Sequence, residues 1–302
     1  MTQNPPSTTK KQLKRVRLHN RYVFEGKLTM QTGLHIGGGK ATLSHTDSPV
    51  VLTQDGLPFI PGSSLKGVLR STIEKLIASL LPELGLHTCG LPTEEIRVSE
   101  ESCPTAHQKA ISEERRMHPN DIPQIMERVR NDLCHTCQLF GSPFTAAHIT
   151  VNDLYLIDEQ WSGTIQVRDG VAIDRDSETA KSGAKYDFEV VPPTTVFKLY
   201  VTIENATPTD LQLISIGLSE FVSGFGGIGG LRSRGLGACI LNELQIRSLK
   251  LTDEDRTQRL QRYLLRNMNG KDDGLDVEDT QAFFNKHIEA LFQVSKQQNN
   301  GE

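Results

Sequence analysis

The stretch Gly224-Phe-Gly-Gly-Ile-Gly-Gly-Leu-Arg-Ser-Arg-Gly-Leu-Gly237 contains seven glycines in fourteen residues, and it includes Arg232 and Arg234. Residues without a Cβ atom adopt positive φ angles readily and let another backbone approach closely. Exposed N–H groups beside two guanidinium groups favour the binding of a string of phosphates. The alternative is a flexible hairpin loop that binds nothing.

The patterns on either side of this glycine run exclude two familiar nucleotide-binding loops. Residues 211–222 have the apolar spacing of a helix, and residues 237–246 alternate as a strand does. A dinucleotide-binding Gly-x-Gly-x-x-Gly loop instead follows a strand and opens a helix. A P-loop would close with Gly-Lys followed by Ser or Thr, and the run has no lysine.

Further periodic segments lie upstream of the glycine run. Residues 64–81 predict a helix with Ser63 as its N-cap, because apolar residues recur along one face. Strands are predicted at 22–31, 149–157 and Val196–Glu204. The resulting order, β-α-β-β-α-β, predicts an α+β fold with a ferredoxin-like (RRM-like) palm, the arrangement shared by RNA-recognition domains.

The remaining segments predict how the chain is divided. Residues 1–21 are polar and rich in Lys and Arg, so we expect a flexible basic arm. The palm spans 22–247 and contains an insertion at 85–145 and a charged, protruding hairpin or loop at 160–190. Residues 248–302 predict a helical C-terminal extension with helices near 253–267 and 280–293.

The composition is that of a globular protein of one or two domains. Of the 302 residues, 36% are hydrophobic and 23% are charged, and the formal net charge is −4. No apolar run has membrane-spanning length, and the polar start is not a secretory signal, so we expect a cytoplasmic protein without membrane contact. The negative charge argues against a simple nucleic-acid coat.

The cysteines predict a structural metal site. Cys134 and Cys137 form a Cys-x-x-Cys pair, and Cys103 and Cys89 lie upstream. Two close and two distant thiols match the ligand set of tetrahedral Zn²⁺. A thioredoxin-like redox pair is the alternative, but the surrounding pattern does not fit it. His87, His107 and His135 compete with Cys89 for the fourth position; Cys239, within a strand, is expected to be a packed thiol.

Two further motifs are compatible with anion binding or catalysis, but each is also compatible with a purely structural role. Ile60-Pro-Gly-Ser-Ser-Leu-Lys-Gly-Val-Leu-Arg70 opens a helix, so its backbone N–H groups and Lys66 form a plausible anion site, or an ordinary capped helix. Asp47, before Ser-Pro, is by spacing alone most typical of a turn.

Taken together, these motifs resemble the backbone subunits of type III CRISPR-Cas effector complexes, which are members of the RAMP superfamily. The resemblance runs from about residue 22 to residue 247 and depends on the order of six anchors. In this sequence they are Thr32-Gly-Leu-His-Ile-Gly-Gly38, Asp47-Ser-Pro-Val50, Ile60-Pro-Gly-Ser-Ser-Leu-Lys-Gly67, Leu139-Phe-Gly-Ser142, Val171-Ala-Ile-Asp-Arg175 and Gly229-Gly-Leu-Arg-Ser-Arg-Gly-Leu-Gly237.

The resemblance implies a function. Such subunits polymerise along a guide RNA (crRNA), contact neighbouring copies and other effector subunits, and pair the guide with target RNA. The stretch at 160–190 matches the thumb that interrupts this pairing and splays out a base. Asp47 matches the aspartate that supports cleavage of target RNA with Mg²⁺ or Mn²⁺ at six-nucleotide spacing. Cleavage would use the RNA 2′-hydroxyl and leave a 2′,3′-cyclic phosphate.

The same resemblance implies the residues that contact RNA. They are His35, Lys66, Arg70, Arg168, Arg175, Gly229, Gly230, Arg232 and Arg234. The cysteine-bearing insertion departs from the compact family form and is similar to zinc-bearing relatives. Two other functions stay open: a structural RNA-binding subunit that does not cleave, and an endoribonuclease that processes guide precursors.

Overall fold

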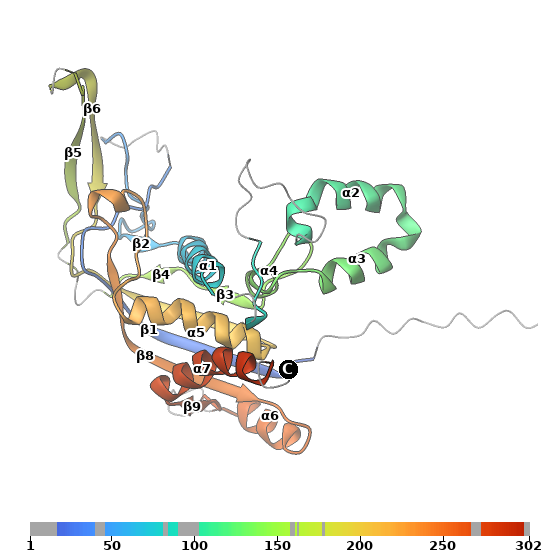
Figure 1. Ribbon diagram of the computed structural model, residues 1–302. Helices are drawn as coiled ribbons and strands as arrows, with labels where there is room; N and C mark the ends of the chain where they lie inside the picture. Colours follow the sequence, from blue (N-terminus) through green and yellow to red (C-terminus); the bar gives the residue numbers. More distant parts are fainter. Residues whose placement is uncertain are drawn as a thin grey trace, which may run out of the picture.

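The computed structural model describes residues 17–39, 46–80, 84–89, 103–157, 161, 163–176, 179–266 and 273–298. Residues 1–16, most of the expected basic arm, lie outside this set. The main sheet has the strand order β3-β7-β1-β8-β9, and two smaller sheets pair β2 with β4 and β5 with β6 (Figure 1). The mixed α+β class predicted from the sequence is confirmed.

The centre of the main sheet is built from β1 (Asn20–Met30), β7 (Val196–Glu204) and β8 (Cys239–Lys250). The central strand, β1, pairs antiparallel with both neighbours. Alternate residues of β7, among them Phe197, are buried, whereas the residues between them are exposed or half-buried. The two-residue alternation thus predicted β7 with its observed bounds, since side chains of a strand point to opposite faces.

Helices α1 (Gly62–Ala78) and α5 (Pro208–Val222) share one hydrophobic core with the sheet. The buried stripe of α1 includes Leu65 and Ile73, as expected from its apolar spacing. At its N-terminus α5 carries a capping box, in which Thr207 and Asp210 satisfy each other's backbone N–H groups.

The start of α1 differs from the sequence prediction. Ser63 was expected to cap the helix, but the N-cap position is Pro61 and no side chain caps from there. Instead, the Gly62 N–H donates to Asp153 Oδ1 at 2.7 Å. A Cβ atom at Gly62 would lie 2.2 Å from the Val151 carbonyl oxygen, so the close contact requires glycine.

The same contact explains why the predicted strand at 149–157 does not run unbroken over that range. It is divided into β3 (Ile149–Val151), which pairs with β7, and β4 (Leu154–Tyr155), which pairs with β2 (Phe59–Ile60). The break lets Asp153 turn toward the start of α1. One sequence segment therefore contributes to two sheets.

The insertion expected at 85–145 forms several short helices, and α2 and α3 extend away from the sheet (Figure 1). They are α2 (Gln108–Met117), α3 (Ile122–Asn131) and α4 (His135–Phe140), with 3-10 turns at Pro104–His107 and Pro119–Asp121. A small separate core joins α2 and α3 and contains Ile111, Ile125 and Val129.

The charged segment expected at 160–190 contains an antiparallel hairpin of β5 (Gln166–Ile173) and β6 (Ala180–Val190). It extends from the sheet at the left of Figure 1. Its base is anchored by the buried side chains of Phe188, Val190 and Leu236. Because Leu236 belongs to the glycine run, that run and the hairpin pack together at this base.

The C-terminal segment is part of the main fold as well as an extension of it. It contains α6 (Arg256–Leu264), β9 (Asp276–Glu278) and α7 (Thr280–Gln298). The sequence did not predict β9, which pairs with β8, and β8 itself runs past the expected boundary at 247 to Lys250. Phe283 and Phe284 of α7 are buried in the main core.

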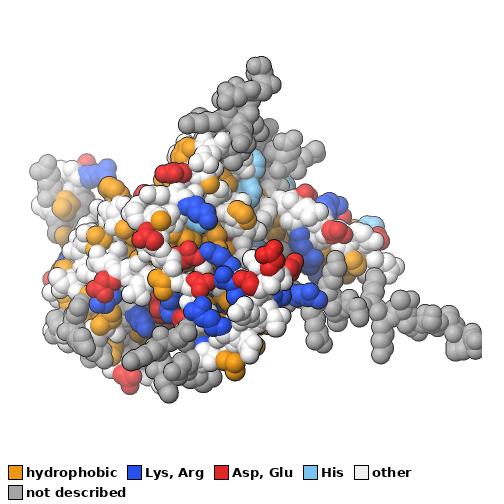
Figure 2. Space-filling model, turned by 90° about the horizontal axis from the view of Figure 1, so that it is seen from below, with side chains coloured by type: hydrophobic (Ala, Val, Ile, Leu, Met, Phe, Trp, Pro, Cys, Tyr) orange, Lys and Arg blue, Asp and Glu red, His pale blue; other side chains and the backbone are white. Residues whose placement is uncertain are grey.

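The face of the molecule seen from below carries interleaved positive and negative side chains (Figure 2). Many charged side chains of the protein form ion pairs: Arg247 bonds to Glu25 and Asp273, and Arg259 bonds to Asp255 and Asp276. Such paired charges leave little net positive field for a polyanion. None of the helices in the described ranges has the length and apolar character needed to span a membrane.

Candidate functional site

Three segments far apart in the sequence meet at the base of the hairpin. The loop after β1 lies against β6, with Leu34 paired to Val191 and Ser48 paired to Phe188. The Gly237 N–H donates to the Gly33 carbonyl at 2.8 Å, which joins the same loop to the glycine run. The first and the last of the six anchors, Thr32–Gly38 and Gly229–Gly237, are therefore neighbours in space.

His35 lies at the centre of this meeting point. Its side chain is 7% exposed, its Nδ1 lies 2.8 Å from the Glu189 carbonyl oxygen, and its Nε2 lies 3.3 Å from Ser48 Oγ. Since a carbonyl oxygen only accepts, Nδ1 carries the proton of that bond. The ring also meets Phe188 edge to face. His35 thus connects loop and hairpin, and little of it is accessible to an RNA.

Gly229 and Gly230 of the glycine run pack on the backbone of His35. The Gly230 N–H donates to the His35 carbonyl oxygen at 2.8 Å. Gly229 has a φ of +89°, and a Cβ atom there would lie 2.5 Å from the same oxygen. Only glycine combines this φ with so close an approach. The structure therefore provides a packing reason for Gly229, whereas a Cβ atom at Gly230 would lie no closer than 3.6 Å to a neighbouring atom.

Asp47, the predicted catalytic residue, is exposed at the foot of the hairpin. Its N–H donates to Asp187 Oδ1 at 2.6 Å, and the Asp187 N–H donates to Asp47 Oδ2 at 3.1 Å. Glu189 on the same strand accepts from the Val50 N–H at 2.9 Å and from Thr46 Oγ1 at 3.2 Å. Two acidic residues of β6 therefore fix the loop that carries Asp47.

Four of the predicted RNA-contacting arginines lie on the hairpin and the glycine run. Arg234 stacks over the Tyr186 ring at 5.5 Å, and Arg168 extends from β5 toward Gly33. Arg232 lies beside Gly227, whereas Arg175 is at the tip of the hairpin, away from the others. Within the described ranges none of these exposed guanidinium groups is paired with a carboxylate, unlike the arginines near α6.

The remaining two RNA candidates, Lys66 and Arg70, lie on α1. Burial, together with the nearby charge of Arg70, lowers the pKa of Lys66. Arg70 does not point to the hairpin base: its Nη2 lies 3.3 Å from Cys137 Sγ and its Nε bonds to Glu74 Oε1 at 2.8 Å. These surroundings differ from those expected of an RNA contact.

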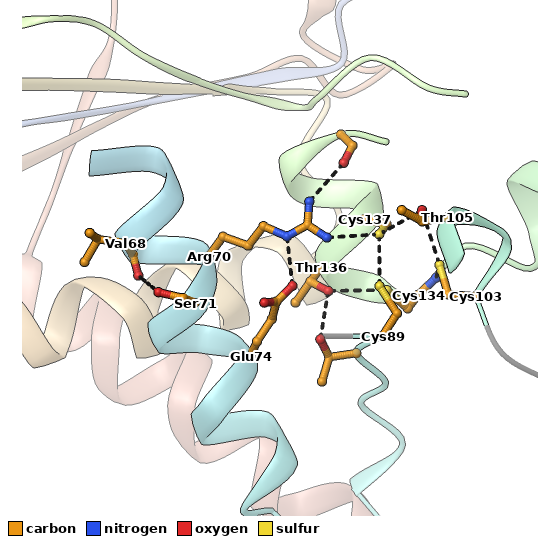
Figure 3. Close-up of polar contacts among 12 residues, drawn as sticks. Val68, Arg70, Ser71, Glu74, Cys89, Cys103, Thr105, Cys134, Thr136 and Cys137 are labelled. Carbon is orange, nitrogen blue, oxygen red and sulfur yellow. Dashed lines mark hydrogen bonds and ion pairs between the residues drawn. The ribbon is translucent and has the colours of Figure 1, made fainter. Parts of the chain in front are cut away.

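The four predicted metal ligands meet between α1 and the insertion (Figure 3). The sulfur atoms of Cys89, Cys103, Cys134 and Cys137 all lie within 4.8 Å of one another. Zn–S bonds of about 2.3 Å place the sulfurs of a tetrahedral site about 3.8 Å apart, so the set fits a zinc ion. Cys89 and Cys137 are 3.5 Å apart, too far for a disulfide.

The fourth member of the cluster is Cys89, and among the described residues no histidine belongs to it. His135 and His87 stack on each other at 5.8 Å, and His135 Nδ1 accepts the His87 N–H. Burial lowers the pKa of His135, which favours the neutral ring that this bond needs. Cys239 is fully buried within β8, as predicted for a packed thiol, and burial raises its pKa to about 12.

The sequence patterns did not predict a role for residues of β6, although these residues position the loop that carries Asp47. The segment Tyr186-Asp187-Phe188-Glu189-Val190 alternates between ring or apolar side chains and acidic ones. Its apolar side packs at the hairpin base, and its acidic side contacts the Asp47 loop. That alternation is the signal that could have predicted a strand here and a role for Asp187 and Glu189.

Comparison with known proteins identifies a family to which the chain is similar. Residues 27–240 match the RAMP superfamily. The chain is 28% identical over 221 residues to the "CRISPR system Cms endoribonuclease Csm3" of Enterococcus italicus, which covers 72% of this chain and 89% of that protein.

Shorter matches carry the same name. The protein from Methanocaldococcus jannaschii is 45% identical over 60 residues, covering 19% of this chain and 24% of the relative. The protein from Streptococcus thermophilus is 43% identical over 56 residues, covering 18% and 26%. This chain thus aligns with about a quarter of the length of each of these two relatives.

Proposed function

The chain belongs to the RAMP superfamily, and on that premise we propose that it is a backbone subunit of a type III CRISPR effector complex. In this proposal it binds the guide RNA (crRNA), contacts neighbouring copies and other effector subunits, and acts on target RNA in the cytoplasm. The endoribonuclease relatives support the nuclease part. The observation that carries the proposal is the meeting of the Asp47 loop, the hairpin and the glycine run. Arginines beside them have no carboxylate partner among the described residues.

The sheet supports a ferredoxin-like palm. The strands β3-β7-β1-β8 are antiparallel, α1 lies between β1 and β3 in the sequence, and α5 lies between β7 and β8. This is the order of two β-α-β units that share one sheet, the arrangement of RNA-recognition domains. Gly62 and Gly229, both at close backbone contacts, fix the entry to α1 and the path of the glycine run.

The guide RNA is proposed to pass along the glycine run and the base of the hairpin. Arg232 and Arg234 extend from the run, and Arg168 extends from β5 toward Gly33, which is hydrogen-bonded to Gly237 of the run. Because these groups have no carboxylate partner in the described ranges, they can neutralise phosphates without breaking an ion pair. Sequence is then read by base pairing with the guide, so the protein needs to recognise only the backbone.

Target cleavage is proposed to occur at Asp47. The hairpin β5/β6 acts as the thumb, with Arg175 at its tip, and splays one nucleotide out of the guide–target duplex. Splaying aligns the 2′-hydroxyl with the scissile phosphate, which is a positioning effect. Asp47 Oδ1 makes no hydrogen bond within the described ranges and is available to orient this group. Mg²⁺ or Mn²⁺, when bound, would neutralise charge on the phosphate.

The cysteine cluster is proposed to be a structural zinc site. Four thiolates and no open position are typical of zinc that stabilises a fold instead of catalysing a reaction. Its ligands come from two stretches of the insertion, Cys89 with Cys103 and Cys134 with Cys137. Zinc would therefore hold these parts of the insertion together at a place where the apolar core is small.

The experiment that tests this function compares Asp47→Ala with Asp55→Ala in the assembled complex. Asp55 is an exposed aspartate of a neighbouring loop and serves as the matched control. We expect Asp47→Ala to abolish cleavage of guide-complementary RNA with guide binding unchanged, and Asp55→Ala to cleave as the wild type does. Cleavage retained by Asp47→Ala, with its metal dependence, would remove Asp47 from the mechanism.

Two other functions give different outcomes. A structural subunit without nuclease activity would bind the guide and leave target RNA intact even as wild type. An endoribonuclease that processes guide precursors would cut repeat RNA as the isolated protein, without a bound guide. The unpaired arginines suit all three functions, whereas the exposed Asp47 at the hairpin base favours target cleavage.

A further inference from the structure

Arg70 lies between α1 and the cysteine cluster, and its guanidinium group has three partners (Figure 3). The Nε donates to Glu74 Oε1 at 2.8 Å, Nη1 donates to the Gly141 carbonyl at 3.4 Å, and Nη2 donates to Cys137 Sγ at 3.3 Å. Each of the three nitrogens is thus directed at a different part of the chain.

The Arg70 guanidinium group is largely buried, so its positive charge needs negative charge nearby. The Arg70 side chain is 24% exposed and that of Glu74 only 9% exposed. A guanidinium group keeps its charge in proteins, and Glu74 lies beside it as an ion-pair partner. Removing a charged group from water is costly unless it is paired and hydrogen-bonded.

Zinc with four thiolates has a net charge of about −2, so the proposed metal site supplies such a charge. Among the described residues, the other hydrogen bonds to the sulfurs come from neutral groups. Thr105 Oγ1 lies 3.2 Å from Cys137 Sγ, Thr136 Oγ1 lies 3.3 Å from Cys134 Sγ, and the Cys134 N–H donates to Cys103 Sγ. Within the described ranges, Arg70 is the cationic side chain that donates to a sulfur of the cluster.

We propose that Arg70 is a positioning residue of the cysteine metal site, where its guanidinium stabilises the thiolate complex and Glu74 fixes its orientation. The same group holds the Gly141 turn against α1, so metal binding by the insertion stabilises the palm. The proposal rests on the proposed zinc site and is independent of whether the protein cleaves RNA. It gives Arg70 a role other than the RNA contact that the sequence predicted.

A simpler role would be an i,i+4 ion pair within α1, since Arg70 and Glu74 are one turn apart. The two roles differ in one measurable respect. A helix ion pair stabilises the protein equally with and without metal, whereas a positioning residue changes the affinity for the metal itself.

The test measures zinc affinity of the full-length protein by competition with a chromophoric zinc chelator. Arg70→Gln removes the charge, Arg70→Lys keeps the charge but not the planar fork, and Glu74→Gln removes the orienting carboxylate. Lys75→Gln, an exposed change on the same helix, is the control. We expect Arg70→Gln to weaken zinc binding by about 10- to 100-fold, as loss of an outer-shell partner does. Arg70→Lys and Glu74→Gln should give smaller losses and Lys75→Gln none.

Thermal unfolding with zinc and with excess chelator provides a second readout. The stabilisation by zinc should be smaller in Arg70→Gln than in the wild type. Equal zinc affinity in all variants, with the same loss of stability in both conditions, would overturn the proposal and leave a helix ion pair. Wild-type protein that binds no zinc would overturn the metal site and with it the role of Arg70, whatever the result for RNA cleavage. If Arg70→Gln does not fold, the affinities of Arg70→Lys and Glu74→Gln decide.

Discussion

Replacing Asp187 by Ala tests whether the Asp47 loop is positioned by the hairpin. The substitution removes the Oδ1 atom that accepts the Asp47 N–H at 2.6 Å, while the Asp187 N–H that donates to Asp47 Oδ2 remains. The loop therefore loses one of the two hydrogen bonds that join Asp47 to β6.

The size of the effect follows from that single bond. A hydrogen bond of this kind contributes about 0.5–1.5 kcal/mol, because water replaces the lost partner at an exposed site. If the loss reduces the population of the correctly placed loop by this free energy, the cleavage rate falls by about 2- to 13-fold. Asp187→Asn keeps an accepting oxygen, so its rate should stay within about 2-fold of the wild type.

The assay is single-turnover cleavage of guide-complementary RNA by the assembled complex, with guide binding measured in parallel. Asp169→Ala is the matched control, because Asp169 faces Asp187 across the hairpin but, in the described part of the chain, forms its ion pair with the exposed Lys185. An unchanged rate in Asp187→Ala, with cleavage abolished by Asp47→Ala, would refute positioning by the hairpin. A loss as complete as that of Asp47→Ala would instead mean that Asp187 takes a direct part in the reaction.

Three further predictions test packing, RNA binding and pH dependence. Gly229→Ala should destabilise the protein by roughly 1–3 kcal/mol and lower its melting temperature, because φ is +89° and the Cβ meets a carbonyl oxygen. Replacing Arg232 and Arg234 by Gln should weaken guide binding and reduce its salt dependence, measured by filter binding. The hydrogen bond to Asp210 raises the pKa of His148, so this pair stabilises the fold at pH below about 6.5 and its contribution is lost as pH rises. Urea unfolding of His148→Gln should therefore show a larger deficit at pH 5.5 than at pH 8.

Matched controls separate these effects from general damage. Gly235→Ala also has a positive φ but has no atom within 4 Å of the added Cβ, so it should cost less than Gly229→Ala. Arg262→Gln removes an arginine that is paired with Asp276, and should leave guide binding unchanged. A pH-independent deficit in His148→Gln would show that the ion pair with Asp210 does not form.

Patterns in the sequence predicted those features that depend on one-sided burial of a strand or on the spacing of metal ligands. Val196–Glu204 was predicted with its observed bounds because one face of β7 is buried and the other is not. The Cys-x-x-Cys pair and the upstream thiols predicted a cluster that could hold a metal, and the structure brings these four cysteines together. The choice of Cys89 over the nearby histidines depends on the path of the chain, which spacing does not determine.

Tertiary contacts determined what the sequence patterns missed. The strand predicted at 149–157 breaks because Asp153 turns to cap α1 and the Val151 carbonyl packs on Gly62. Strand β9 has only three residues, too few for a visible alternation. The contact of Arg70 with Cys137 was also not predicted, because a guanidinium group binds any anion and a helical pattern does not distinguish RNA from a thiolate cluster.

The central claim is that the Asp47 loop and the hairpin form a site that cuts target RNA held on a guide. The most direct measurement maps the cut positions on a guide-complementary RNA incubated with the purified wild-type complex and Mg²⁺ or Mn²⁺. We predict cuts at six-nucleotide intervals, with 2′,3′-cyclic phosphate and 5′-hydroxyl ends, and no cuts with Asp47→Ala. Target RNA that stays intact while guide and target are both bound would contradict the claim.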